Sequence, residues 1–187
     1  MTEATVLVVD DETEVADVYA LRLRNEYETK TAYGGGEALE MIDDDIDVVL
    51  LDRRMPDISG DDVLDEIRDS DLDMRVIMIT AVDPDFDIIE MPFDDYLCKP
   101  VDKDDLVAAI EQQLAARRYD ERLSEYLETT SKLALLEAEK TPQSIEDSDE
   151  MAQLQQRAAQ LRAEMDDALA EFEDITTAFE EIGRRPG

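Results

Sequence analysis

The chain has 187 residues, of which 43% are apolar, so it can form one medium-sized domain with a packed core and a smaller unit. Its 51 acidic and 18 basic residues give a formal net charge of −33. This charge disfavours nucleic-acid binding through a basic surface, because such binding rests largely on neutralising phosphates. The absence of histidine excludes histidine metal sites, Ser-His or Cys-His catalysis and any role as a phosphohistidine donor.

The acidic charge is spread along the whole chain. Residues 1–118 have a net charge of −22 (11 basic, 33 acidic), and residues 119–187 have a net charge of −11 (7 basic, 18 acidic). The basic residues are 13 Arg and only 5 Lys. An even acidic coat with few lysines is typical of proteins that stay soluble in concentrated salt, where screening removes self-repulsion. We therefore expect a cytoplasmic protein of a halophile.

No targeting or membrane segment is evident, so we expect no membrane partner. The residues Met1–Ala4 do not include the basic stretch that precedes the apolar core of a secretory signal. Apolar runs of about five residues are too short to cross a membrane. The single cysteine, Cys98, excludes an internal disulfide, and we expect it to be a small packed strand residue because free cysteines are commonly buried.

Short apolar runs in the first hundred residues predict strands. Val6–Val9, Val48–Leu51 and Val76–Ile79 are rich in β-branched residues or leucine and do not alternate with polar residues. This pattern is typical of strands that are buried on both faces of a parallel sheet. Tyr96–Cys98 is a weaker run, and the more polar Glu28–Ala32 predicts an edge strand.

Helix-like stretches separate these runs, namely Glu14–Asn25, Gly36–Asp43 and Asp61–Arg68. Strands that alternate with short helices predict an α/β fold with a doubly wound five-stranded parallel sheet. The stretch Ala81–Asp95 contains two prolines and six acidic residues, and predicts only a short or distorted helix. In the first helix we expect five apolar residues on or near one side: Val15, Val18, Tyr19, Leu21 and Leu23.

Residues 1–118 and 119–187 are predicted to be separate domains, the second of them helical. After Pro100 the pattern becomes helical, and Thr141-Pro142 separates helices of about 119–140 and 145–182. The helices form either an antiparallel hairpin or an intermolecular coiled coil, and we expect a hairpin that also offers a dimer or partner surface. In the last helix, apolar or small residues recur at alternating spacings of three and four, as in a coiled-coil seam: Met151, Leu154, Ala158, Leu161, Met165, Ala168, Phe172, Ile175, Phe179 and Ile182.

Chemically active side chains follow the predicted strands. Asp10-Asp11, Asp52, Thr80 and Lys99 each lie at the carboxyl end of a run, where doubly wound sheets bind ligands. Clustered carboxylates repel one another, so we expect a divalent cation there, and Mg²⁺ suits carboxylates, waters and phosphate oxygens. We predict that Asp52 is the nucleophile that forms an acyl phosphate, and that Asp11, helped by Asp10, holds Mg²⁺.

Two further side chains complete the predicted site. Lys99 supplies a positive charge to the phosphoryl oxygens, and Thr80 donates a hydroxyl hydrogen bond to one of them. A competing enzyme class, the haloacid-dehalogenase-type phosphatases, also uses an aspartyl nucleophile but needs a second aspartate two residues later. Position 54 is arginine, which counts against that class, so we do not expect an enzyme.

Over residues 5–118 the sequence resembles the response-regulator receiver family. The resemblance rests on Val-Leu-Val-Val-Asp-Asp-Glu at 6–12, Leu-Asp-Arg-Arg-Met-Pro-Asp-Ile-Ser-Gly at 51–60, Ile-Thr-Ala at 79–81 and Tyr-Leu-Cys-Lys-Pro at 96–100. It implies strand order 2-1-3-4-5 and phosphorylation of Asp52 by a sensor histidine kinase. It also implies Mg²⁺ binding by the backbone carbonyl of Arg54, switching by Thr80 and Tyr96, and a cis peptide at Lys99-Pro100.

The helical region resembles the HalX domain that follows receivers in haloarchaeal regulators, in position, length, acidity and helix pattern. This resemblance implies a role in transcriptional regulation. Direct DNA binding stays open, because basic residues are sparse and interleaved with acids. The alternative is a protein-interaction or scaffold module without direct DNA binding.

Overall fold

The computed structural model describes residues 4–181, except the side chains of Phe172 and residues 175–181. Among the described residues, 4–114 lie in a first compact unit, which is an α/β domain, and Ala115–Thr177 form a second unit, which is helical. The first unit contains, in chain order, β1 (Thr5–Val9), α1 (Thr13–Leu23), β2 (Glu28–Ala32), α2 (Gly35–Met41), β3 (Val48–Leu51), α3 (Gly60–Asp69), β4 (Arg75–Thr80), the 3₁₀ helix η1 (Phe86–Glu90), β5 (Asp95–Cys98) and the start of α4 (Lys103–Glu139).

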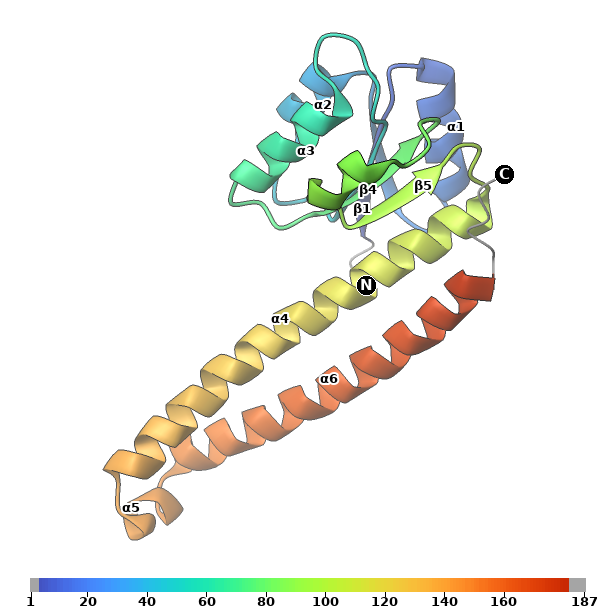
Figure 1. The fold of residues 1–187 in the computed structure, drawn as a ribbon. Helices are drawn as coiled ribbons and strands as arrows, with labels where there is room; N and C mark the ends of the chain where they lie inside the picture. The colour runs from blue at the N-terminus through green and yellow to red at the C-terminus, as the bar shows by residue number, and fades with distance from the viewer. Residues whose placement is uncertain (1–3, 182–187) are drawn as a thin grey trace. The chain divides into compact units, whose positions relative to one another are not determined.

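The five strands form one parallel sheet in the order β2-β1-β3-β4-β5. The predicted fold class and strand order are therefore confirmed, and β2 lies at the edge as expected. Helices cover both faces of the sheet, with α2 and α3 on one side and α1 on the other (Figure 1). This coverage explains the non-alternating apolar runs, because each strand must place apolar side chains against helices in both directions.

Successive strand residues alternate between the two cores. Val8 and Leu50 pack with α1 and the start of α4, whereas Val9 and Leu51 pack with α2 and α3. On α1, only Ala16, Tyr19 and Leu23 are buried. The list of apolar residues expected on the buried side of α1 was partly wrong, since two of its members face solvent: Val18, 45% exposed, and Leu21, 54% exposed.

The physical reason is the narrow stripe that α1 places on the sheet. Each residue turns a helix by about 100°, so Val18 and Leu21 lie well around the helix from Tyr19 and its buried neighbours. The prediction that Cys98 is packed was also wrong, because Cys98 is exposed. It is the last residue of β5, an edge strand that only β4 neighbours.

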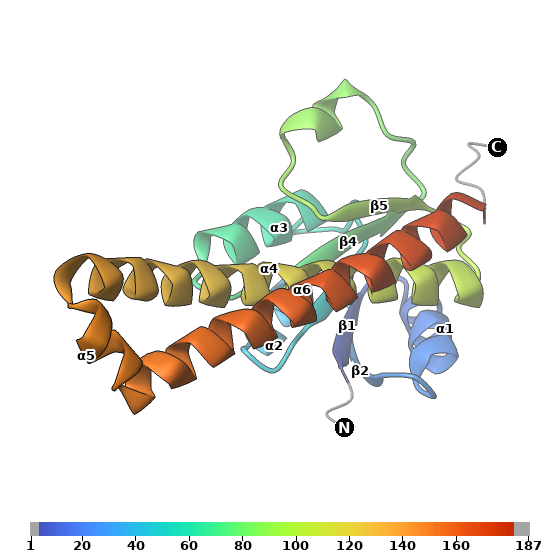
Figure 2. The same ribbon diagram turned by 90° about the horizontal axis from the view of Figure 1, so that it is seen from below.

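The segment between β4 and β5 is as irregular as its prolines predict. It contains only η1, a five-residue 3₁₀ helix in which no residue is buried. In Figure 2 the loop that holds η1 projects away from the sheet. Its two most exposed apolar side chains are Phe86, 85% exposed, and Ile89, 75% exposed.

The helical unit is an antiparallel hairpin. The second half of α4 leads through α5 (Pro142–Glu146) to α6 (Asp149–Glu181), and α5 joins the adjacent ends of the two long helices (Figure 1). Thr141 caps α5 by accepting a hydrogen bond from Ser144 N at 3.3 Å, and Pro142 is in the first turn, so the predicted break lies at this turn. Because α4 is continuous, the predicted domain boundary at 118/119 falls inside a helix.

Ion pairs between α4 and α6 show the register of the hairpin. Arg118 contacts Glu171 at 2.7 Å, Arg122 contacts Glu164 at 2.7 Å, and Arg157 contacts Glu125 at 2.6 Å, so positions rise along α4 as they fall along α6. These pairs are partly exposed, and surface ion pairs contribute little stability each, so the seam between them supplies most of it.

The predicted seam of α6 is confirmed where its side chains are described. Met151, Ala158, Leu161 and Ala168 are buried. Leu154 and Met165 are half-buried. The remaining predicted members, Phe172, Ile175, Phe179 and Ile182, lie outside the described side chains. Within residues 4–181, no helix combines the length and apolar character that a membrane crossing requires.

Leu161 offers a test of the seam, because its side chain is fully buried. We predict that Leu161→Ala lowers the free energy of unfolding of the helical unit by about 2–4 kcal/mol, through lost burial and a residual cavity. Leu169→Ala, at a position of the same helix that is 43% exposed, should cost much less. Chemical denaturation in molar KCl, followed by circular dichroism, measures both; equal losses would contradict the assignment of the seam.

Candidate functional site

The carboxyl ends of four parallel strands meet at one edge of the sheet. The register pairs Val9 with Leu51 and Thr80 with Cys98, so the residues that follow these strands emerge side by side. Asp10 follows β1, Asp52 follows β3 and Lys99 follows β5. Backbone bonds continue the alignment past the strand ends, since Asp52 N donates to Val9 O at 2.9 Å and Lys99 N donates to Thr80 O at 2.9 Å.

Three carboxylates and one ammonium form the centre of the site. Asp10, Asp11 and Asp52 each place a carboxylate oxygen within 4.8 Å of the others. Asp10 and Asp52 are buried, at 2% and 7% exposed. Lys99 Nζ donates a hydrogen bond to Asp10 Oδ2 and lies 3.5 Å from Asp52 Oδ1. One lysine thus faces three acids, which leaves the cluster with excess negative charge.

Burial, more than the neighbouring charges, changes the protonation of the acceptor. Burial raises the pKa of Asp52 to about 6, the charges of Asp10 and Asp11 add to the rise, and Lys99 opposes it. For Lys99, burial acts to lower the pKa, but the bond to Asp10 and the charges of Asp52 and Asp10 raise it overall. A cation that replaced water near the three carboxylates would relieve their repulsion, and hard oxygen donors of this kind suit Mg²⁺.

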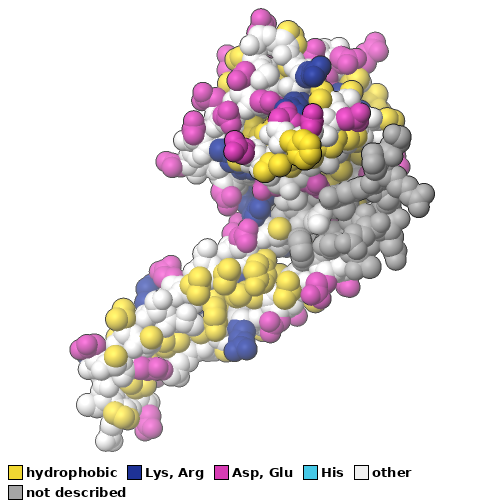
Figure 3. Space-filling view, in the orientation of Figure 1, with side chains coloured by type: hydrophobic (Ala, Val, Ile, Leu, Met, Phe, Trp, Pro, Cys, Tyr) yellow, Lys and Arg dark blue, Asp and Glu magenta, His cyan; other side chains and the backbone are white. Residues whose placement is uncertain are grey.

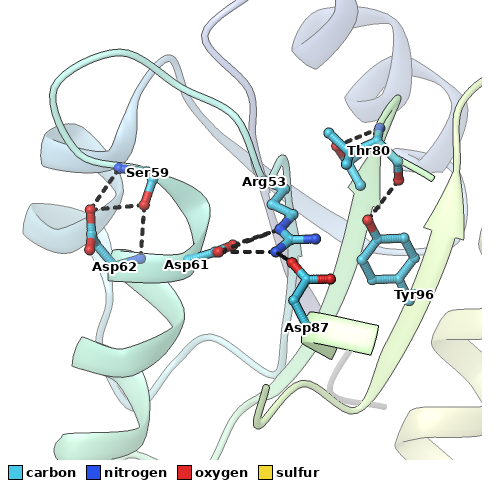
Figure 4. Close-up of polar contacts among 8 residues, drawn as sticks. Arg53, Ser59, Asp61, Asp62, Thr80, Asp87 and Tyr96 are labelled. Atoms are coloured by element: carbon cyan, nitrogen blue, oxygen red, sulfur yellow. Dashed lines mark hydrogen bonds and ion pairs between the residues drawn. The ribbon is translucent and has the colours of Figure 1, made fainter. Parts of the chain in front are cut away.

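The loop after Asp52 is held by a close backbone approach. Gly60 N donates to Arg53 O at 2.8 Å. A Cβ atom on Gly60 would lie 2.1 Å from the carbonyl oxygen of Asp52, so only glycine fits. Just before it, Ser59 and Asp62 form a capping box at the start of α3 (Figure 4). The specific Gly and Ser positions of the motif therefore fix the backbone of the acceptor.

Thr80 and Tyr96 are connected through the backbone of one residue, Val82. Thr80, at 1% exposed, accepts a hydrogen bond at its Oγ1 from Val82 N at 3.2 Å. The Tyr96 hydroxyl donates to Val82 O at 2.7 Å, and the ring contacts Phe93 with centroids 5.5 Å apart. Both side chains thus hold the loop that leaves β4 (Figure 4).

The structure brings together the predicted Asp10, Asp11, Asp52 and Lys99, and it places Thr80 at the end of the next strand. The cis peptide predicted at Lys99-Pro100 is confirmed. The side chain of Arg54 is exposed, and no described contact involves its carbonyl oxygen. The chemical roles assigned to these residues stay predictions.

Sequence analysis missed Arg53. Its side chain, 12% exposed, pairs with Asp61 of α3 and with Asp87 of η1 (Figure 4). The only local signal was its position directly after Asp52, because its partners lie 8 and 34 residues away in the chain.

Two known domain families match the sequence. The family described as the response regulator receiver domain matches residues 6–111, and the HalX domain matches residues 115–182. The chain belongs to the response regulators. Its receiver and HalX domains follow one another as the two resemblances in the sequence predict.

Solved receiver domains share the fold of this response regulator. One from Clostridium thermocellum is 32% identical, with a TM-score of 0.56 over 61% of this chain and 96% of that one. One from Methanospirillum hungatei is 29% identical, with a TM-score of 0.56 over 60% and 94%. TrrA of Thermotoga maritima, solved in complex with Mg²⁺-BeF, is 32% identical, with a TM-score of 0.51 over 59% and 98%.

A curated relative comes from the halophile Haloferax volcanii and bears the name "Putative transcriptional regulator". It is 50% identical over 137 residues, which are 73% of this chain and 24% of the relative. This response regulator therefore spans about a quarter of that protein's length. The source of the relative agrees with the acidic composition.

The raised pKa of Asp52 predicts that removing the acceptor stabilises the metal-free fold. The pKa of Asp52 is higher in the folded chain than the ordinary 3.8, so the folded state loses stability relative to the unfolded state as pH rises from about 4 to 6. Asn cannot ionise, so Asp52→Asn should gain about 1–3 kcal/mol over wild type above pH 6, and little below pH 4.

Urea denaturation in EDTA across this pH range measures the difference. The control is Asp44→Asn, at an exposed position, whose difference from wild type should stay flat. A flat profile for Asp52→Asn as well would show that folding does not raise the pKa of Asp52.

Proposed function

We propose that this response regulator accepts a phosphoryl group on Asp52 from a sensor histidine kinase, in a Mg²⁺-dependent reaction, and so switches its helical output region. The observation that carries the proposal is the group of Asp10, Asp11, Asp52 and Lys99 at one end of the sheet. It provides a buried nucleophile, a set of metal ligands and a cation in one place.

The proposed transfer uses the chain's own side chains in distinct ways. A carboxylate oxygen of Asp52 forms a bond to phosphorus while the bond between phosphorus and the donor's imidazole nitrogen breaks, and its electron pair stays on that nitrogen. The ionised form of Asp52 is the nucleophile, so its pKa of about 6 leaves it mostly active at neutral pH. Lys99, 3.5 Å from Asp52, is close enough to hold a phosphoryl oxygen.

Asp10, Asp11 and Asp52 would hold Mg²⁺, with the backbone carbonyl of Arg54 as a further ligand that the family resemblance implies. When bound, the ion offsets the charge that gathers on the phosphoryl oxygens. TrrA, which is similar to this chain, was solved with Mg²⁺-BeF, and this supports the choice of metal.

The proposed switch begins at Thr80. Its oxygen accepts a hydrogen bond from Val82 N, which leaves its hydroxyl hydrogen for a phosphoryl oxygen. If Thr80 moves toward that oxygen, Val82 loses a bond, and the carbonyl that accepts from the Tyr96 hydroxyl shifts with it. The state of Asp52 would thereby reach the loop before η1.

Acetyl phosphate tests the acceptor. We predict that acetyl phosphate and Mg²⁺ label the wild type. Labelling should be lost in Asp52→Ala, because the nucleophile is removed, and in EDTA, because the metal ion that offsets the negative charge is removed. The matched control is Asp57→Asn in the same loop, where φ is 66° and asparagine tolerates this backbone. Phos-tag gels in molar KCl measure the fraction labelled; equal labelling of wild type and Asp52→Ala would reject the proposal.

For the output, we propose control of transcription through a protein partner. The name of the Haloferax relative supports transcriptional regulation. Acidic side chains are spread over the face shown in Figure 3, and basic ones are sparse. In the hairpin, Arg118, Arg122 and Arg157 already pair with glutamates, which leaves them poorly placed to neutralise phosphates. The alternative output is a homodimer, since Leu127 and Leu135 of α4 are 55% and 67% exposed and would be covered by a second copy.

Retention on DNA distinguishes output through a protein partner from output through direct DNA binding. We predict no retention of the phosphorylated or unphosphorylated chain on mixed genomic fragments at any KCl concentration, because the helices lack a basic surface. Salt-dependent retention that weakens on Arg162→Gln would instead favour direct binding. Light scattering in the same buffers gives the mass and decides whether the chain self-associates.

A further inference from the structure

Arg53 connects three elements of the receiver domain. Its backbone oxygen accepts a hydrogen bond from Gly60 N at 2.8 Å. Its Nε donates to Asp61 Oδ1 of α3 at 3.1 Å, and its terminal nitrogen donates to Asp87 of η1. A planar guanidinium suits this arrangement, because it presents several donors in fixed directions to two carboxylates at once (Figure 4).

The segment η1 has few other attachments. None of its residues is buried, and its remaining hydrogen bonds are local, such as Ile88 N to Asp85 O at 3.1 Å and Phe86 N to Asp85 Oδ1 at 2.7 Å. Within the described part of the chain, the pair with Arg53 is the one polar contact that joins an η1 side chain to another element. In that pair the Arg53 side chain is only 12% exposed, whereas the Asp87 side chain is 52% exposed.

The loop before η1 is held by a second anchor that starts at the proposed switch. Val82 is bonded through its N–H to Thr80 and through its carbonyl to the Tyr96 hydroxyl. Arg53 also acts on Tyr96: burial raises the pKa of the Tyr96 hydroxyl, and the hydrogen bond and charge of Arg53 oppose this rise. The projecting segment is thus tied down at its base by Thr80 and Tyr96, and at its middle by Arg53.

We propose that Arg53 is a positioning residue of the switch, which holds η1 against the acceptor loop through Asp87. This inference rests on the proposed function only in its last step, the response to phosphorylation. Arg53 is covalently next to Asp52, so a movement of the acceptor backbone displaces one end of the ion pair. Release of Val82 by Thr80 frees the other end of the segment, and the Arg53–Asp87 pair then limits how far Phe86 and Ile89 move.

Amide exchange of the full-length chain, without phosphodonor, tests the attachment. In Arg53→Gln and in Asp87→Asn, the amides of Ile88 and Met91 should exchange about fivefold faster than in wild type, as expected for loss of one ion pair. The double variant should be no faster than either single variant, because both remove the same contact. Asp87→Glu, which keeps a carboxylate, should restore part of the protection.

The matched control is Glu90→Gln, which removes one charge from η1 at a residue with no ion pair or hydrogen bond among the contacts described. It should exchange like wild type. An unchanged rate in Asp87→Asn, or additive effects in the double variant, would overturn the proposal.

The last step is measured with acetyl phosphate and Mg²⁺. Asp87→Asn should be labelled as fast as wild type, because Asp87 lies outside the acceptor site, and phosphorylation should alter η1 exchange less than half as much as in wild type. Normal labelling with an equal change in both proteins would refute the coupling through Arg53. Failure to label the wild type would refute the proposed function and leave the exchange result on the unphosphorylated chain as it stands.

Discussion

The receiver domain depends on one constraint, the burial of two carboxylates beside a third with a single lysine to balance them. Parallel strands bring Asp10, Asp11 and Asp52 within 4.8 Å of one another, and Lys99 provides one positive charge in return. The fold tolerates this because two cores of apolar side chains, one on each face of the sheet, hold the strand ends in place. Stability is given up at the site where a metal ion and a phosphoryl group can restore charge balance.

The same edge of the sheet organises the polar contacts beyond the acids. Gly60 allows α3 to approach the carbonyl oxygen of Asp52. Val82 donates a hydrogen bond to Thr80 and accepts one from the Tyr96 hydroxyl. These contacts fix the acceptor loop and the start of the η1 segment. Because η1 itself buries no residue, a loosely packed segment lies next to the site while the sheet stays packed.

Much of the fold and of the site's membership followed from local patterns. The β-branched runs located β1, β3 and β4, the prolines marked the irregular segment before β5, and alternating spacings of three and four located the seam of α6. Patterns failed where a choice between similar side chains depended on distant neighbours. Val18 and Leu21 are as apolar as the buried residues of α1, but the sheet contacts only one stripe of that helix.

The sequence by itself determined the family and which residues of the site follow which strand. A parallel sheet brings the carboxyl ends of its strands to one edge whatever the course of the loops, so these residues had to lie near one another. Only the tertiary structure decided the partners of Arg53, since Asp61 and Asp87 are two among 51 acidic residues and nothing local distinguishes them. Only it decided the hairpin register, which depends on how α4 and α6 meet. Periodicity reports which face of an element is apolar, whereas the pairing of charges depends on contacts between segments far apart in the chain.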